Sequence, residues 1–174
     1  EFRPRPPPRV APADSRTSGS EPSRLAMAAA ALRAQLNALL ANMFTTGMVD
    51  EQFQQLQSLQ EDGGSASGFV AEVATLFIDD ADRIIADIAA LLDQPVVDFD
   101  KVDAHVHQLK GSSSSVGAQK VKLACMHFRQ FYEAKSKEGC LMALALVRSE
   151  FCDVRNKFQT MMQLEQQIAA CGPK

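Results

Sequence analysis

Apolar residues recur every three or four positions along most of this 174-residue chain, and no other feature limits its possible folds as strongly. In the stretch 29–43, for example, Leu32, Leu36 and Leu39 fall on one face of a helix. No segment alternates apolar and polar residues with the β-branched content of a strand. Abundant leucine, alanine and glutamine favour helices as well. The pattern therefore predicts an all-α protein.

Glycine and proline divide this pattern into six segments. The expected helices cover about 29–43, 50–60, 67–92, 98–115, 118–136 and 140–170. Short turns join the last four, which predicts an antiparallel four-helix bundle. The two additional N-terminal helices would pack across one end of this bundle or along its side.

Residues 1–26 differ from the rest in composition. They combine proline, arginine and serine with almost no large apolar side chains, so they cannot offset the entropy lost on ordering, and we expect them to be disordered. The helical pattern opens at Met27, and Glu1-Phe2 would suit a cloning-site remnant. We therefore interpret 1–26 as a leader or a segment added by cloning, and 27–174 as the folded domain.

Charge and hydropathy exclude several classes of protein. The net charge is −3, and it falls to −5 without residues 1–26, which hold five arginines against three acids. Such an acidic domain lacks the cations needed to track nucleic-acid phosphates. No stretch reaches the roughly 20 apolar residues of a membrane span. The four cysteines form no CxxC pair, and we expect reduced thiols that pack as small apolar groups. These features predict a soluble intracellular protein without a nucleic-acid or membrane partner.

The stretch 102–118 carries the most specific chemical information. On a helical wheel of about 100° per residue, one narrow arc must face the core. This arc contains Val102, Val106, Leu109, Ser113 and Val116. His107 lies about 140° from the centre of the arc and is expected to point outward. Asp103, Lys110, Gly111 and Ser114 share its face.

The residues of this outward face have low helix propensity. Gly111 costs about 1 kcal/mol relative to alanine in a helix interior, and the serine run that follows lowers helix propensity further. Because side chains lean toward the helix N-terminus, the residue at i+4 partly covers the residue at i. Gly111 is i+4 to His107 and has no side chain to cover it. We therefore expect steric clearance around an exposed imidazole.

Lys110 and Ser114 lie on the same outward face as His107. We call the surface formed by His107, Lys110, Gly111 and Ser114 the His107 strip. Lys110, at i+3, would favour the neutral, nucleophilic ring of His107 and could pair with an anionic group attached to it. Ser114 could add a hydroxyl hydrogen bond. An isolated exposed histidine is usually an ordinary surface residue. A histidine, a lysine and a glycine in this phase on a weak helix instead favour a functional site.

The sequence HQLKGSSSSVGA at 107–118 resembles the motif of histidine-containing phosphotransfer proteins, particularly those of plant cytokinin-type phosphorelays. The resemblance extends over about 27–170, including the aspartate-rich third helix and the FRQFY segment at 128–132. It implies that His107 takes a phosphoryl group from a receiver-domain aspartate of a hybrid histidine kinase and passes it to an aspartate of a response regulator. The chain would then be a carrier and not an enzyme.

The resemblance also implies the partners and the location. Receiver domains of kinases and regulators would dock on the chain and supply Mg²⁺, so we expect no cofactor or metal site in the chain itself. Gln108 and Asp103 would serve docking or hydrogen bonding. We expect a monomer in the cytoplasm and nucleus.

The other histidines fit a metal site poorly. His105 is two residues from His107, about 200° around the helix, so the two cannot chelate one ion. We interpret His105 and His127 as structural residues. A metal-dependent hydrolase in a helical bundle would need Glu-x-x-His pairs, which are missing. A helical adaptor without chemistry stays possible, but it would not need the strip around His107.

Overall fold

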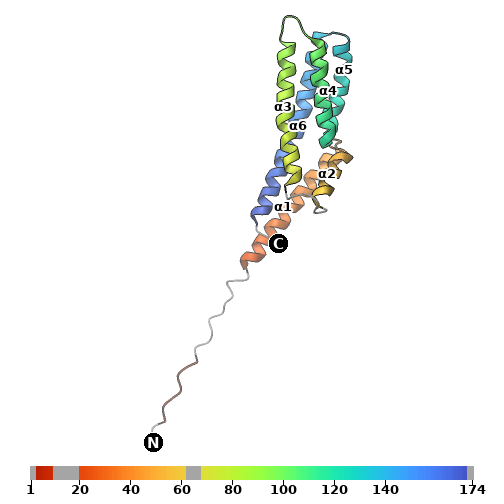
Figure 1. Ribbon diagram of the computed structural model, residues 1–174. Coiled ribbons are helices and arrows are strands. Elements are labelled where there is room, and N and C mark those ends of the chain that lie inside the picture. Colours follow the sequence, from red (N-terminus) through yellow and green to blue (C-terminus); the bar gives the residue numbers. More distant parts are fainter. Residues whose placement is uncertain (1–2, 10–19, 62–67, 172–174) are drawn as a thin grey trace.

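The computed structural model describes residues 3–9, 20–61 and 68–171. Within them the chain forms six α-helices and no strand. The helices are α1 (Ser20–Thr45), α2 (Glu51–Glu61), α3 (Phe69–Leu92), α4 (Phe99–Val116), α5 (Gln119–Glu133) and α6 (Lys137–Ala170). Figure 1 shows α3 to α6 side by side, with α1 and α2 toward one end. The predicted all-helical class is confirmed for the described residues.

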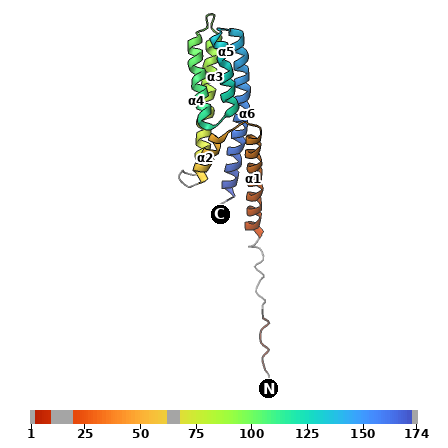
Figure 2. The ribbon, with the colours of Figure 1, turned by 90° about the vertical axis from the view of Figure 1, so that its right-hand side faces the viewer.

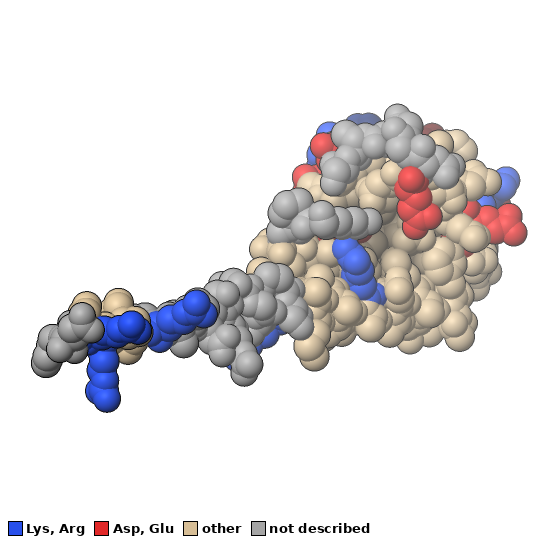
Figure 3. Space-filling view, turned by 90° about the horizontal axis from the view of Figure 1, so that it is seen from below, with Lys and Arg blue, Asp and Glu red and all other residues tan. Residues whose placement is uncertain are grey.

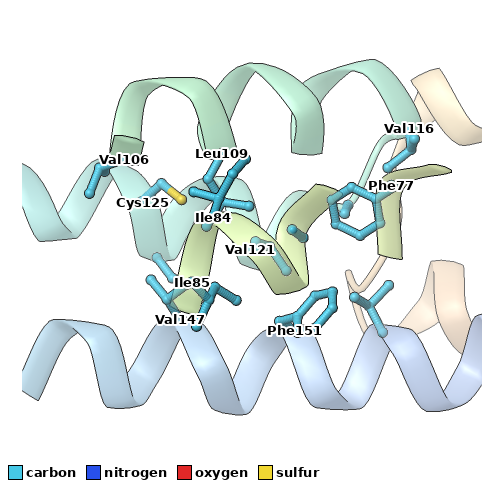
Figure 4. Close-up of a cluster of buried hydrophobic side chains, with 14 of the residues drawn as sticks. Phe77, Ile84, Ile85, Val106, Leu109, Val116, Val121, Cys125, Val147 and Phe151 are labelled. Carbon is cyan, nitrogen blue, oxygen red and sulfur yellow. The ribbon is translucent and has the colours of Figure 1, made fainter. Parts of the chain in front are cut away.

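The helices α3 to α6 form a closed ring of contacts. Helix α3 packs on α4, α4 on α5, α5 on α6, and α6 on α3. Consecutive helices run in opposite directions, as Figures 1 and 2 show. Each contributes one apolar stripe to a shared interior, seen in Figure 4. Phe77, Ile84, Leu109 and Phe151 are among the buried side chains of this core, which holds α4 with one face inward and the opposite face toward solvent.

Local capping fixes both ends of α4. The Asp98 carboxylate accepts a hydrogen bond from the backbone N–H of Lys101 at 3.2 Å and caps the N-terminus. Gly117 ends the helix in the left-handed conformation, with φ of 75°. A Cβ at position 117 would lie 2.5 Å from the backbone nitrogen of Phe53. Glycine is therefore required here by conformation and by space.

The turn after α4 is tied to the turn before α2. The Asp50 N–H donates to the Gly117 carbonyl at 3.0 Å, and the Gln119 N–H donates to the Met48 carbonyl at 3.1 Å. Helix α2 then packs on α3 and α4. These two backbone hydrogen bonds place α2 at the Gly117 end of α4.

Helix α1 packs along α6, at the end of the molecule away from the α5–α6 turn. It begins at Ser20 and not near residue 29, so the predicted disorder is wrong for 20–26. The alanine-rich stretch 26–34 has high helix propensity, which favours a long helix here. Residues 3–9 are exposed and form neither helix nor strand. The remainder of the expected leader, 1–2 and 10–19, lies outside the described residues.

The boundary between α5 and α6 also differs from the prediction. Helix α5 ends at Glu133, because Lys135 adopts a left-handed φ of 53° and the Ser136 hydroxyl caps α6 by accepting from the Gly139 N–H at 3.0 Å. Helix α6 therefore starts at Lys137, three residues earlier than expected. In the described ranges, no helix has the length and apolarity that would let it cross a membrane.

Candidate functional site on helix α4

His107 lies in the middle of α4 and is exposed. The five residues predicted to face the core are all buried: Val102, Val106, Leu109, Ser113 and Val116. Asp103, Gln108 and Gly111 are exposed, and Lys110 and Ser114 are partly buried. The helical phase inferred from the sequence is therefore confirmed, and it presents the imidazole to solvent.

The serine run is satisfied within the helix. The hydroxyls of Ser113, Ser114 and Ser115 donate to the carbonyls of Leu109, Lys110 and Gly111 at 2.8, 2.9 and 3.0 Å. Such bonds let Ser113 be buried without an unpaired hydroxyl. The hydrogen bond to the Lys110 carbonyl also uses the hydroxyl hydrogen of Ser114. In addition, Ser114 is two turns, or about 10 Å, along the helix from His107. A direct hydrogen bond from Ser114 to a group on His107 does not fit this arrangement.

Gly111 borders open space. A Cβ built on it would meet no atom within 4 Å outside its own helix turn. At Gly139, by contrast, a Cβ would run into the ring of Phe131. Contact with Phe131 thus explains why residue 139 is a glycine. No contact within the described part of the protein explains the glycine at position 111. The empty space beside His107 is available to a molecule from outside.

Lys110 lies on the α5 side of the strip. Burial raises the pKa of the Cys125 thiol on α5 to about 12, and the positive charge of Lys110 opposes this increase. The lysine is therefore close enough to α5 for its charge to act there. It leaves the opposite, Gly111 side of His107 open.

The structure adds neighbours that sequence reasoning did not single out. A hollow of about 400 Å³ runs along the α4–α5 surface next to His107. Its lining consists of Phe99, Asp100, Asp103, His107, Arg129, Tyr132, Glu133 and Lys135. The antiparallel packing of α4 on α5 brings these residues together. The FRQFY segment at 128–132, noted only for its resemblance, was the one signal in the sequence that could have pointed to Arg129 and Tyr132.

Charged and phenolic groups from α5 border this hollow. The Arg129 Nε donates to Glu133 Oε1 at 2.6 Å, and this ion pair, with the Asp103 and Tyr132 groups nearby, raises the pKa of the guanidinium. Burial raises the pKa of the Tyr132 phenol to about 12, and the Asp103 carboxylate beside it adds to the increase. Tyr132 therefore keeps its proton at neutral pH. The hollow combines both signs of charge next to the imidazole.

The remaining histidines lie elsewhere. His105 is partly buried on α4, as its phase predicted. His127 is exposed on α5, where its ring meets the edge of Phe131 and its nitrogens lie 3.1–3.2 Å from the Gln130 amide. Over the described ranges, no three His, Cys, Asp or Glu side chains gather as a metal site would require. All four cysteines are free, with Cys125 and Cys140 buried.

A hollow larger than the one beside His107 lies elsewhere in the molecule and does not contain this chemistry. It measures about 870 Å³ and lies among the lower parts of α1, α3 and α6, where Leu36, Leu76 and Met162 line it. Figure 3, a view from below, shows mostly uncharged residues among those that it colours at this end, although Arg33, Glu72 and Glu165 also line the hollow. Among the described residues, no histidine, cysteine or serine borders the hollow. The candidate site is therefore the His107 strip.

Comparisons with known proteins identify the family. The Hpt domain family matches residues 72–170. Histidine-containing phosphotransfer protein 2 of rice (Oryza sativa subsp. japonica) is 73% identical over 148 residues, which cover 85% of this chain and 99% of the relative. The crystal structure of a histidine-containing phosphotransfer protein from maize is 75% identical, with a TM-score of 0.76 over 79% of this chain and 99% of that one. One from Medicago truncatula is 40% identical, with a TM-score of 0.77 over 82% and 96%.

The chain belongs to the Hpt domain family, as its motif indicated. Proteins of this family are phosphotransfer carriers of two-component phosphorelays. The matched range contains α4, and with it His107, Lys110 and Gly111.

Proposed function

We propose that His107 is the phosphorylated residue of this carrier. The observation that carries the proposal is an exposed imidazole beside open space at Gly111 and a lysine at i+3. A receiver domain must bring its phospho-aspartate within bonding distance of the ring, so access from outside is essential. The antiparallel four-helix bundle of α3 to α6 would act as a rigid support for this contact.

The transfer needs little machinery in the carrier. Phosphoryl transfer depends mainly on positioning and on stabilising charge, with Mg²⁺ bridging oxygens. We infer that the receiver domain supplies the metal ion. Lys110 would pair with the phosphoryl oxygens. Gln108 and Asp103, both exposed on α4, would contact the docked receiver.

We further propose the direction and setting of the relay. The donor would be the receiver domain of a hybrid histidine kinase, and the acceptor a response regulator, in cytokinin signalling. A monomer present in both cytoplasm and nucleus would connect the two partners. The high identity to plant histidine-containing phosphotransfer proteins supports this assignment.

The test is transfer of ³²P from a phosphorylated receiver domain to the wild-type chain and to His107→Gln. We expect acid-labile, base-stable phosphate on the wild type and none on the variant. His127→Gln, which changes another exposed histidine, is the matched control and should accept phosphate normally. Phosphate on His107→Gln, or none on the wild type with any cognate receiver, would instead indicate an adaptor without chemistry.

A further inference from the structure

Asp103 and Tyr132 line the same hollow as His107, and the function proposed above gives Asp103 only a docking contact and Tyr132 no role. Asp103 is i−4 to His107, one helical turn away. Because helical side chains lean toward the N-terminus, the ring of His107 leans toward the turn that carries Asp103. Tyr132, from α5, approaches the same carboxylate from the other wall of the hollow.

Tyr132 is suited to hold this carboxylate. The centroid of its ring lies 6.2 Å from the ring centroid of the buried Phe128, so the core sets the position of the tyrosine. Its pKa of about 12, raised first by burial and then by Asp103, means that the hydroxyl is present as a donor. A carboxylate accepting this hydroxyl retains lone pairs for a second donor.

The second donor could be the ring N–H of His107, and the chemistry of the carried phosphoryl group indicates why such a hydrogen bond would matter. When one ring nitrogen of neutral His107 attacks the phosphorus, an N–P bond forms, the P–O bond to the receiver aspartate breaks, and its electron pair stays on that carboxylate. The other ring nitrogen keeps its proton, so the phosphorylated ring is cationic. In the onward step the N–P bond breaks and its electron pair returns to the ring. A protonated ring then leaves as neutral imidazole, whereas a deprotonated ring would leave as an anion.

We propose that Asp103, held by Tyr132, accepts a hydrogen bond from the N–H of the His107 ring and keeps the phosphorylated ring protonated. Asp103 and Tyr132 are then positioning residues, which make His107 a better phosphoryl donor near neutral pH. The arrangement resembles the way in which a carboxylate stabilises an imidazolium in hydrolytic triads. This inference rests on the proposed phosphorylation of His107.

Other charged groups lie on the same surface as the ring and act on it in both directions. From α4 these are Asp100 and Lys110, from α5 Arg129 and Glu133, and from the α5–α6 turn Lys135. Arg129 and Glu133 are paired with each other, which reduces their effect on the ring. Asp100 lies two turns from His107, too far along the helix for the contact that Asp103 can make. It provides a control with the same change of charge.

The experiment compares wild type, Asp103→Asn, Tyr132→Phe and Asp100→Asn. The proteins are phosphorylated by a receiver domain and purified, and donation to a response regulator is followed from pH 6 to pH 9. In Asp103→Asn, the pH at which donation falls to half should decrease by about 0.3 pH unit, so that donation near pH 8 is about twofold slower. Tyr132→Phe should shift it in the same direction by less. Asp100→Asn should leave it within a tenth of a unit.

Two further readouts separate this inference from the proposed function. Hydrolysis of the phosphorylated protein alone should show the same shift in its pH profile. In the unphosphorylated proteins, the ¹⁵N NMR signal of the protonated ring nitrogen of His107 should shift in Asp103→Asn, because its hydrogen bond is lost, but not in Asp100→Asn. Equal profiles for Asp103→Asn and Asp100→Asn would overturn the inference while His107 remained the carrier. An unshifted NMR signal in Asp103→Asn would overturn the inference, whether or not the wild type accepts phosphate. Failure of the wild type to accept phosphate would separately refute the proposed function.

Discussion

Replacing Gly111 with alanine should make the protein more stable and a poorer carrier. Gly111 is in the interior of α4, and an added Cβ meets no atom within 4 Å outside its own helix turn, so the substitution creates no clash. The gain in helix propensity should then appear almost in full. We expect the free energy of unfolding to rise by about 1 kcal/mol. For a chain of this length, that corresponds to an increase in Tm of about 2–4 °C.

Transfer should change in the opposite direction. The new methyl group occupies space beside His107 that a receiver domain would need in the proposed transfer, so Gly111→Ala should accept phosphate more slowly. Gly111→Leu should nearly abolish transfer, because its longer side chain leans back over the imidazole. The comparison separates access from folding, since a folding defect would lower both quantities together.

The assay combines thermal unfolding with the rate of receiver-to-protein transfer on the same samples. Circular dichroism checks that Gly111→Leu retains its helices. If folded Gly111→Leu transferred at the wild-type rate, the glycine would not provide access, and the reasoning for this strip would be refuted. A drop in stability for Gly111→Ala would contradict the open space seen in the structure.

Three other changes test individual features of the structure. Lys110→Ala should alter the free energy of unfolding by no more than about 0.5 kcal/mol yet slow transfer clearly, with partial rescue in Lys110→Arg; early unfolding with normal transfer would make the lysine structural. Gly139→Ala forces a methyl group against Phe131 and should lower stability by about 1–3 kcal/mol in urea unfolding, and an unchanged midpoint would contradict this clash. The raised pKa of Cys125, about 12 against 9.0, means that the unfolded chain loses the thiol proton first. Stability should therefore decrease from about pH 9 to pH 12, less steeply in Cys125→Ala, and equal slopes would count against a buried neutral thiol.

The sequence predicted most of what a single helix determines. The phase of α4 follows from its 3.6-residue period, so the burial of Val106 and Leu109 and the exposure of His107 could be read directly. Helix ends were less predictable, because they depend on single capping groups and backbone conformations. Lys135, in a left-handed conformation, ended α5 earlier than its composition suggested.

Contacts between helices could not be read from the chain in this way. Arg129 and Tyr132 are more than 20 residues from His107, and only the antiparallel packing of α5 on α4 places them in one hollow with it. In the same way, the backbone hydrogen bond from Asp50 to Gly117 joins segments more than 60 residues apart.

Periodicity reports which face of a helix is buried but not which neighbour covers it. The exposure of His107, the proposed nucleophile, was therefore determined by the sequence alone, through local helix geometry and the small residues around it. The charges that surround this histidine were decided only by the tertiary structure, because the register between α4 and α5 depends on how the whole core packs.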